Sequence, residues 1–271
     1  MKVVVNGVTY SVEVCGKGHP VVLLHGFTGS LDNWKTFVSM WKSRFTLILV
    51  DIIGHGKSEA PADYKRYSME NVVADLACLL DALKVEKTHL VGYSMGGRLA
   101  LSFAVTYPDR LKKIVLESTS PGLQTEKERE ARRKNDEALA NKLEKLGIEK
   151  FVDEWEDIPL FSSQKSLASE RLLRLREQRL LNNPFGLANS LRGMGTGAQP
   201  SWWSELAKIN HPTLLLCGEL DKKFCEIAEK VCTLMPHSTI KKVKDAGHAI
   251  HVEKPKFFGK IVSEFLCKEE R

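Results

Sequence analysis

The heptad GYSMGGR occupies residues 92–98 and contains the pattern G-x-S-x-G. It follows a strand candidate at 88–91 and opens a helical pattern at 95–107. Small residues flank such a serine because it sits on a strained turn, where a neighbouring side chain would collide with the adjacent strand and helix. The turn holds the hydroxyl at a helix N-terminus, which favours a developing anion. We therefore predict that Ser94 is a reactive serine.

An acid and a histidine follow Ser94, in the chain order serine, acid, histidine. Asp221 follows the strand candidate 213–217 in CGELD, and His248 follows the strand candidate 239–243 in DAGHAIH. Residues at the carboxyl ends of these strands project where a base for the serine, and a group that orients the base, are required. We predict that His248 activates Ser94 and that Asp221 orients His248.

Two other acids compete with Asp221. Glu219 lies two residues before Asp221 and has the chemistry to replace it. Asp245 lies three residues before His248, and we assign it to the loop that carries the histidine.

The sequence His25-Gly26-Phe27 follows another strand candidate, at 21–24. It matches the loop that contributes one backbone amide to an oxyanion hole, and the residue after the nucleophile contributes the other. We expect the N–H groups of Phe27 and Met95 to form this hole.

Two further histidines invite a function. His251 lies three residues after His248, a spacing found in metal sites, but no other ligand cluster lies nearby, so we predict no metal. His55, in DIIGHGKS, is expected to be a satisfied loop histidine.

Short β-branched runs alternate with helical patterns over 1–120 and 206–271, which predicts a mostly parallel sheet with crossover helices. Residues 121–205 are rich in charge and helix formers, and we expect a helical cap there. The strand candidates are 2–5, 9–14, 21–24, 46–51, 88–91, 113–117, 213–217 and 239–243, and the helix candidates are 68–83, 95–107, 224–235 and 255–267.

The composition is that of an ordinary globular protein. Of 271 residues, 43% are hydrophobic and 27% charged, which argues against disorder. The apolar runs are far too short for a membrane helix, and MKVVVNG is no signal peptide, so we expect a cytoplasmic protein.

The net charge of +6 arises from interspersed basic and acidic residues, which does not indicate a nucleic-acid surface and leaves acidic small molecules as plausible ligands. The cysteines are too sparse for a disulfide scaffold, and we expect buried free thiols. They are Cys15, Cys78, Cys217, Cys225, Cys232 and Cys267.

The motifs HGF, DIIGHGKS, GYSMGG, CGELD and AGH together resemble the α/β-hydrolase fold superfamily, from about residue 20 to the end of the chain. The resemblance implies an α/β fold with an eight-stranded, mostly parallel sheet and helices on both faces. Residues 1–120 and 206–271 would form the core, and 121–205 would cap a pocket.

The cap resembles one family within that superfamily, the SHCHC synthases of menaquinone biosynthesis, which make 2-succinyl-6-hydroxy-2,4-cyclohexadiene-1-carboxylate. The resemblance implies elimination of pyruvate from 2-succinyl-5-enolpyruvyl-6-hydroxy-3-cyclohexene-1-carboxylate, a substrate with three carboxylates. It rests on GYSMGGR, CGELDKKF, SPGLQ at 120–124, Arg129, Arg132, Trp155, Pro159, Phe161, Arg179 before Asn182-Asn183, and Gln199-Pro200.

The family's substrate arginines correspond to Arg98, Arg132 and Arg179 in this chain. Arginine suits the role because its planar fork binds a carboxylate with two parallel hydrogen bonds. Arg129 and Arg133 remain alternatives to Arg132, since an insertion of one residue would change the match.

Five other side chains complete the substrate-binding residues that the resemblance implies. Trp155 and Phe161 would contact the substrate ring, although both also fit the core of the cap. Tyr93, Gln124 and His25 are the remaining candidates.

The implied mechanism makes Ser94, activated by His248 and Asp221, a general base that removes a proton from carbon. No metal or organic cofactor is expected. The expected partner is a small polycarboxylate substrate, and we expect no nucleic acid and no membrane span. The protein is expected to be a monomer or a weak homo-oligomer.

The alternatives are a serine hydrolase of a small ester, thioester or C–C bond, and a non-catalytic receptor on the same fold. A dehalogenase or epoxide hydrolase would have aspartate in place of Ser94.

Overall fold

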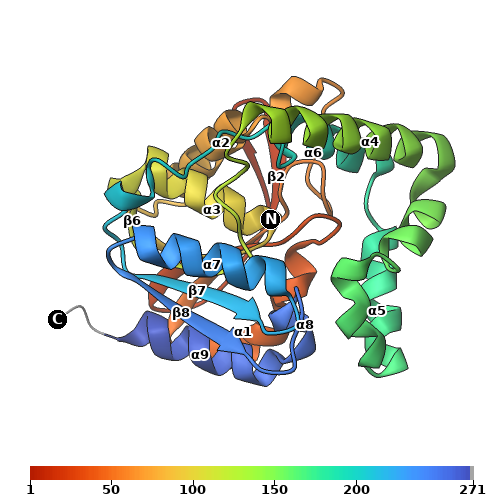
Figure 1. Ribbon diagram of the computed structural model, residues 1–271. Coiled ribbons are helices and arrows are strands. Elements are labelled where there is room, and N and C mark those ends of the chain that lie inside the picture. Colours follow the sequence, from red (N-terminus) through yellow and green to blue (C-terminus); the bar gives the residue numbers. More distant parts are fainter. Residues whose placement is uncertain (269–271) are drawn as a thin grey trace.

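The computed structural model describes residues 1–268 and contains one eight-stranded sheet with the order β1-β2-β4-β3-β5-β6-β7-β8 (Figure 1). The pairs β1–β2 and β2–β4 are antiparallel, and all the others are parallel. The predicted eight-stranded, mostly parallel sheet is confirmed. The strands are β1 (Lys2–Val5), β2 (Val8–Gly16), β3 (His19–Leu24), β4 (Phe45–Val50), β5 (Thr88–Tyr93), β6 (Leu111–Glu117), β7 (Thr213–Gly218) and β8 (Ser238–Val243).

Helices cover both faces of the sheet. Figure 1 shows α1 and α9 below the strands and α2, α3 and α7 above them. Central parallel strands buried on both sides are apolar at every position, and Val21–Leu24 of β3 are fully buried for this reason. The core helices are α1 (Lys35–Trp41), α2 (Met69–Ala82), α3 (Met95–Thr106), α7 (Lys222–Leu234), α8 (Ile250–Glu253) and α9 (Pro255–Cys267), with 3-10 turns at Leu31–Trp34, Tyr64–Tyr67, Pro108–Arg110 and Leu206–Lys208.

Alternate residues of each central strand belong to different layers of the core. Leu23 packs in the layer under α1 and α9, whereas Leu24 packs in the layer under α2, α3 and α7. This period of two is what a strand between two helical layers requires.

Some local predictions differ from the structure. The sequence pattern missed α1, a seven-residue helix whose Phe37 and Trp41 face the core. The fourth strand ends at Val50, because the Asp51 carboxylate accepts the N–H groups of Leu31, at 2.7 Å, and Lys57, at 3.0 Å. Asp51 therefore belongs to the loop after β4 and not to the strand.

The six cysteines are free thiols, as expected, but only two are buried. Cys217 and Cys225 lie in the core, where β7 meets α7. Cys267 is exposed because it is the last residue of α9, where the helix leaves the sheet. The expectation of burial is therefore wrong for Cys267, and it is met only in part by the half-buried thiols of Cys15, Cys78 and Cys232.

Residues 121–205, all described by the structure, contain helices and no strand. The helices are α4 (Glu126–Trp155), α5 (Ser169–Leu180) and α6 (Pro184–Met194), with a 3-10 segment at Pro159–Ser166. Gly147, at φ 78° and ψ 174°, interrupts α4 in a conformation that side chains rarely adopt. In Figure 1 α5 lies beyond the end to which the arrow of β7 points, so these helices border the carboxyl edge of the sheet.

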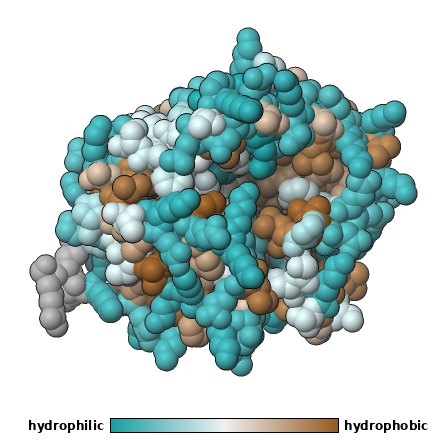
Figure 2. Space-filling model, in the orientation of Figure 1, coloured by the Kyte–Doolittle hydropathy of each residue, from teal (hydrophilic) through white to brown (hydrophobic). Residues whose placement is uncertain are grey.

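The surface is largely polar on the face drawn in Figure 2, and apolar side chains gather in a hollow between the core and the helices of 121–205. Within residues 1–268, no helix combines the length and apolar character needed to cross a membrane.

His25 fastens the loop after β3 to the loop after β4. Its Nδ1 lies 2.8 Å from the carbonyl oxygen of Gly26, and the N–H of Ile52 donates to its Nε2 at 3.0 Å. A nitrogen that accepts a hydrogen bond carries no proton, so the ring is neutral. Burial lowers its pKa from the ordinary 6.5 to about 4.

This neutral histidine makes the fold sensitive to acid. Between pH 6.5 and pH 4 the unfolded chain binds more protons at His25 than the folded chain, so the free energy of unfolding falls as the pH falls. We expect His25 to account for a loss of about 2 kcal/mol between pH 7 and pH 5. Urea unfolding of His25→Gln, which keeps a donor and an acceptor but does not titrate, should show a correspondingly weaker pH dependence. Equal pH dependence in the two proteins would contradict this account.

Candidate active site

Ser94 occupies a sharp turn between β5 and α3. Its backbone adopts φ 49° and ψ −104°, a left-handed conformation that is unfavourable for a non-glycine residue. A Cβ on Gly92 would lie 2.5 Å from the carbonyl oxygen of Gly96, and a Cβ on Gly96 would overlap the carbonyl of Leu24. Both glycines are therefore required by close backbone approach to the helix and to β3, as the motif predicts.

Three strand ends bring a serine, an acid and a histidine together. The Nε2 atom of His248 lies 3.1 Å from the Oγ atom of Ser94, and its Nδ1 lies 2.6 Å from an oxygen of Asp221. The other oxygen of Asp221 accepts the N–H of Phe224 at 3.3 Å, in the first turn of α7. A proton on Nδ1 leaves the lone pair of Nε2 directed at the serine hydroxyl, which is the arrangement of a base.

The geometry distinguishes Asp221 from the two competing acids. The side chain of Asp221 is 8% exposed and directed at His248. Glu219 and Asp245 are both exposed, and Asp245 occupies a positive-φ turn of the loop.

Two backbone amides near Ser94 fit the predicted oxyanion hole. Met95 is the first residue of α3, so its N–H has no acceptor within the helix. Within the described part of the chain, the N–H of Phe27 has no protein acceptor either. Both amides are thus available to a ligand oxygen.

Aromatic rings connect the helices of 121–205 with the histidine. Trp155 lies 5.3 Å from Phe27 and 5.8 Å from Phe161, measured between ring centroids. Phe161 in turn lies 6.4 Å from His248, and Tyr93 lies 5.4 Å from it. The apolar candidates Trp155, Phe161 and Tyr93 are therefore brought together around the base. Burial raises the pKa of Tyr93 well above its ordinary value, so its hydroxyl stays protonated.

Arg98 lies one helical turn after Ser94 and points toward the segment that links α6 to the core. Its Nη1 donates to the carbonyl oxygen of Met194 at 2.7 Å and to the side-chain oxygen of Gln199. Desolvation, reinforced by the nearby charge of Arg132, lowers the pKa of Arg98 to about 10. The group remains a cation at neutral pH, and its two hydrogen bonds go to uncharged oxygens.

Arg132, on α4, lies close enough to Arg98 for its positive charge to lower the pKa of Arg98. Its Nε binds Asp136 at 2.7 Å, and burial raises the pKa of that carboxyl. Arg129 and Arg133 instead reach the carbonyl of Gly197.

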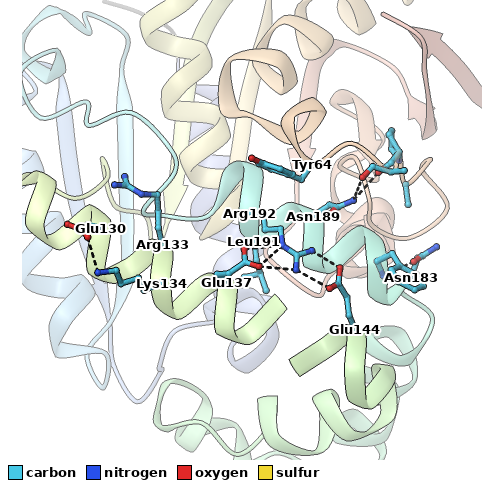
Figure 3. A pocket seen from close by; sticks show the side chains of 14 residues that line it. Tyr64, Glu130, Arg133, Lys134, Glu137, Glu144, Asn183, Asn189, Leu191 and Arg192 are labelled. Atoms are coloured by element: carbon cyan, nitrogen blue, oxygen red, sulfur yellow. Dashed lines mark hydrogen bonds and ion pairs between the residues drawn. The ribbon is translucent and has the colours of Figure 1, made fainter. Parts of the chain in front are cut away.

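Arg133 also lines an outer groove of about 1090 Å³ between α4, α6 and residues 60–64. Figure 3 shows this groove, with Glu130 and Lys134 on the same helix as Arg133. Arg192 lies between Glu137 and Glu144 in the same view. The groove is thus a separate feature from the serine site.

Arg179 approaches from α5. Its Nη1 binds Glu156 at 3.0 Å, and its guanidinium carbon lies 5.2 Å from the centroid of Phe161. This contact places Arg179 at the aromatic side of the site, whereas Arg98 lies beside Gln199.

Three predicted side chains have other surroundings. Both ring nitrogens of His25 are engaged within the protein, so its side chain has no free polar group for a ligand. Gln124 is exposed in the segment before α4. His55 is only half satisfied: Nδ1 lies 3.0 Å from the carbonyl oxygen of Ile53, whereas Nε2 has no partner among residues 1–268, and burial lowers its pKa to about 3.

Sequence reasoning did not single out the partners of these arginines. In the sequence, Asp136 is one of many charged residues on α4. Only the structure identifies it as the carboxylate that binds Arg132. Gln199-Pro200 is among the residues on which the resemblance rests, but nothing in the sequence links Gln199 to Arg98, which is 101 residues away.

The choice of acid can be tested directly. Replacement of Asp221 by Asn should slow the labelling of Ser94 by a fluorophosphonate by roughly 10³- to 10⁴-fold, because an amide does not hold the imidazole in the tautomer that accepts the serine proton. Glu219→Gln is the matched control and should label at the wild-type rate. Similar losses in both variants would mean that Asp221 is not the specific orienting acid.

Comparisons with known proteins agree with this geometry. Residues 19–255 match the family described as alpha/beta hydrolase fold. The chain is 53% identical over 263 residues to a Bacillus subtilis protein named putative 2-succinyl-6-hydroxy-2,4-cyclohexadiene-1-carboxylate synthase, covering 96% of each chain. It is 31% identical over 239 residues to the synthase of that name from Klebsiella pneumoniae, covering 88% of this chain and 90% of the other.

Solved structures agree as well. The structure of MenH from S. aureus matches with a TM-score of 0.90 and 37% identity, covering 95% of this chain and 97% of the other. A malate-bound thermophilic esterase from Thermogutta terrifontis matches with a TM-score of 0.87 and 28% identity, covering 98% of each chain. The chain therefore belongs to the alpha/beta hydrolase fold family and, within it, to the family of the 2-succinyl-6-hydroxy-2,4-cyclohexadiene-1-carboxylate synthases.

Proposed function

We propose that this protein eliminates pyruvate from 2-succinyl-5-enolpyruvyl-6-hydroxy-3-cyclohexene-1-carboxylate to give 2-succinyl-6-hydroxy-2,4-cyclohexadiene-1-carboxylate, a step of menaquinone biosynthesis. The chemistry is that of a carbon–oxygen lyase with a Ser94-His248-Asp221 base system. The relatives that carry the synthase name cover nearly the whole chain.

The observation that carries the proposal is the desolvated cation beside the serine. Arg98 lies four residues after Ser94, and burial lowers its pKa to about 10. Both of its hydrogen bonds go to neutral oxygens. A substrate carboxylate would therefore pair with a cation that folding has already removed from water, so binding would not have to desolvate the arginine. A pocket for an uncharged ester has no need of such a group.

The substrate's substitution pattern defines the reaction. Ring carbon C2 bears the succinyl ketone and adjoins the C3=C4 double bond, while C5 bears the enolpyruvyl ether. When a base removes the C2 proton, the C–H electron pair forms C2=C3 and the C3=C4 pair moves to C4=C5. The C5–O bond breaks, and enolpyruvate leaves to become pyruvate after protonation on carbon.

The three side chains at the strand ends have complementary roles in this scheme. The hydroxyl of Ser94 takes the C2 proton as it passes its own to Nε2 of His248, 3.1 Å away. Asp221 stabilises the imidazolium through Nδ1. The imidazolium then supplies the proton that the leaving enolpyruvate requires.

Negative charge spreads into the succinyl carbonyl as the C2 proton leaves. We propose that the amides of Phe27 and Met95 stabilise this oxygen, because preorganised donors act most strongly where charge develops. Enolate stabilisation and carbonyl attack need the same donors, which accounts for a hydrolase-like site in a lyase.

The helices of 121–205 would serve as the cap that completes the pocket. Arg132 and Arg179 would bind carboxylates from two sides, and Trp155 and Phe161 would contact the ring. The indole N–H of Trp155 is buried and has no partner in the part of the chain that the structure describes. It is therefore free to donate to the substrate.

The activity can be measured as pyruvate release from enzymatically prepared substrate, with p-nitrophenyl acetate hydrolysis measured beside it. We expect release well above the spontaneous rate and its loss in Ser94→Ala. Ester cleavage that depends on Ser94, without accelerated pyruvate release, would instead identify a serine hydrolase, the alternative that the likeness to an esterase favours.

Carboxylate recognition has its own test. Arg132→Ala should raise KM for the tricarboxylate by roughly 10- to 100-fold, since a charged hydrogen-bond pair is lost, and should leave hydrolysis of the uncharged ester unchanged. Arg133→Ala, one residue along the same helix but in the outer groove, should keep the wild-type KM. A raised KM in Arg133→Ala alone would show that the neighbouring arginine faces the substrate.

A further inference from the structure

We infer that Glu117 is a positioning residue for the reaction, which holds Ser94 through its main-chain carbonyl and the loop of His248 through its carboxylate. The inference rests on the proposed function, because it concerns the alignment of the proposed base system. Glu117 does not touch the reacting atoms.

The main-chain contact fixes the nucleophile turn. Glu117 is the last residue of β6 and pairs with Tyr93 at the end of β5. Its carbonyl oxygen accepts the N–H of Ser94 at 2.8 Å. This bond supports the residue whose backbone is strained, at φ 49°.

The side-chain contact fixes the histidine loop. The carboxylate of Glu117 is fully buried, and one oxygen accepts the main-chain N–H of His251 at 2.9 Å. Both oxygens also lie 2.9–3.0 Å from Nδ1 of the same residue. His251 lies in α8, three residues after His248, so the carboxylate ties the start of this short helix to the sheet.

The ring of His251 extends this support toward the base. Its centroid lies 4.6 Å from that of Tyr93 and 5.0 Å from that of Trp34, and Tyr93 lies 5.4 Å from His248. Two carboxylate–imidazole pairs, Asp221 with His248 and Glu117 with His251, thus flank Tyr93. The first pair orients the base, and the second determines where its loop lies.

Two other main-chain N–H bonds hold this loop, and neither reaches the turn of Ser94. The N–H of Gly247 donates to the carboxylate of Glu253, the last residue of α8, at 2.7 Å, and the N–H of Leu220 donates to the carbonyl oxygen of Ala246, at 3.0 Å. The first bond is internal and the second leads to the segment after β7. Glu117 is adjacent to Ser94 across the sheet and bonds to both sides, so its carboxylate controls the distance between Oγ and Nε2.

A buried carboxylate–imidazole contact that only stabilises the fold is the competing explanation. The chain offers a matched control for it in Asp75, which is 1% exposed and binds Arg66 at 2.6 Å and Tyr10 at 2.5 Å. Asp75 belongs to α2 and binds Tyr10 of β2 and Asn6 of the turn between β1 and β2, not the histidine loop. Loss of its charge should lower stability without moving the base.

The test compares Glu117→Ala, Glu117→Gln and Asp75→Asn in three measurements on the full chain. These are kcat and KM for pyruvate release, the rate of Ser94 labelling by a fluorophosphonate, and the melting temperature. We expect Glu117→Ala to lower kcat and the labelling rate by about 100-fold with KM within about 2-fold of wild type, because small misplacement of a base has effects of that size. Glu117→Gln keeps an acceptor for the His251 N–H and should lose about 10-fold.

Asp75→Asn should lower the melting temperature and leave kcat and labelling unchanged. If Glu117→Ala does not fold, kcat and the labelling rate of the isosteric Glu117→Gln variant are compared with those of wild type and Asp75→Asn instead. Wild-type kcat and labelling in a folded Glu117 variant would overturn the inference, as would a change confined to KM. A wild-type protein that labels but releases no pyruvate refutes the proposed function instead, and the labelling rates then still decide the role of Glu117.

Discussion

The strained turn at Ser94 is the constraint on which the rest of the site depends. A left-handed serine between β5 and α3 requires glycine at positions 92 and 96, because the carbonyl of Leu24 and the first turn of α3 leave no room for a Cβ. The strain is supported by the neighbouring strand, whose Glu117 carbonyl accepts the serine N–H. The result is a half-buried hydroxyl at the carboxyl edge of the sheet, beside the amides of Phe27 and Met95, for which the described residues supply no acceptor.

The other polar groups of the site lie at that edge because parallel strands end there together. Asp221 and His248 follow β7 and β8, and the hydrogen bonds that join them to Ser94 are 2.6 and 3.1 Å long. Such a base with nearby oxyanion donors suits ester hydrolysis and proton abstraction equally, since both generate charge on one oxygen. The distinction comes from the residues around the base. We propose that desolvated Arg98, with Arg132 close by, makes the pocket suitable for carboxylates.

Much of this organisation could be predicted from the sequence. The alternation of apolar runs and helical patterns indicated a mostly parallel sheet, and the strand–turn–helix signature of 92–98 located the serine. The sequence also predicts Asp221 as the orienting acid, but it does not exclude Glu219, because residues two positions apart after one strand differ mainly in where their side chains point. The helix α1 was missed because seven residues show too little periodicity.

The sequence by itself determined the features that depend on neighbours in the chain: the glycine-flanked serine, the order of serine, acid and histidine, and the helical character of 121–205. The tertiary structure alone decided which acid faces His248, that Gln199 holds Arg98, that His25 is occupied inside the protein, and that Glu117 binds His251. Those contacts join segments up to 134 residues apart. Strand order and register bring them together, and a local pattern contains no information about either.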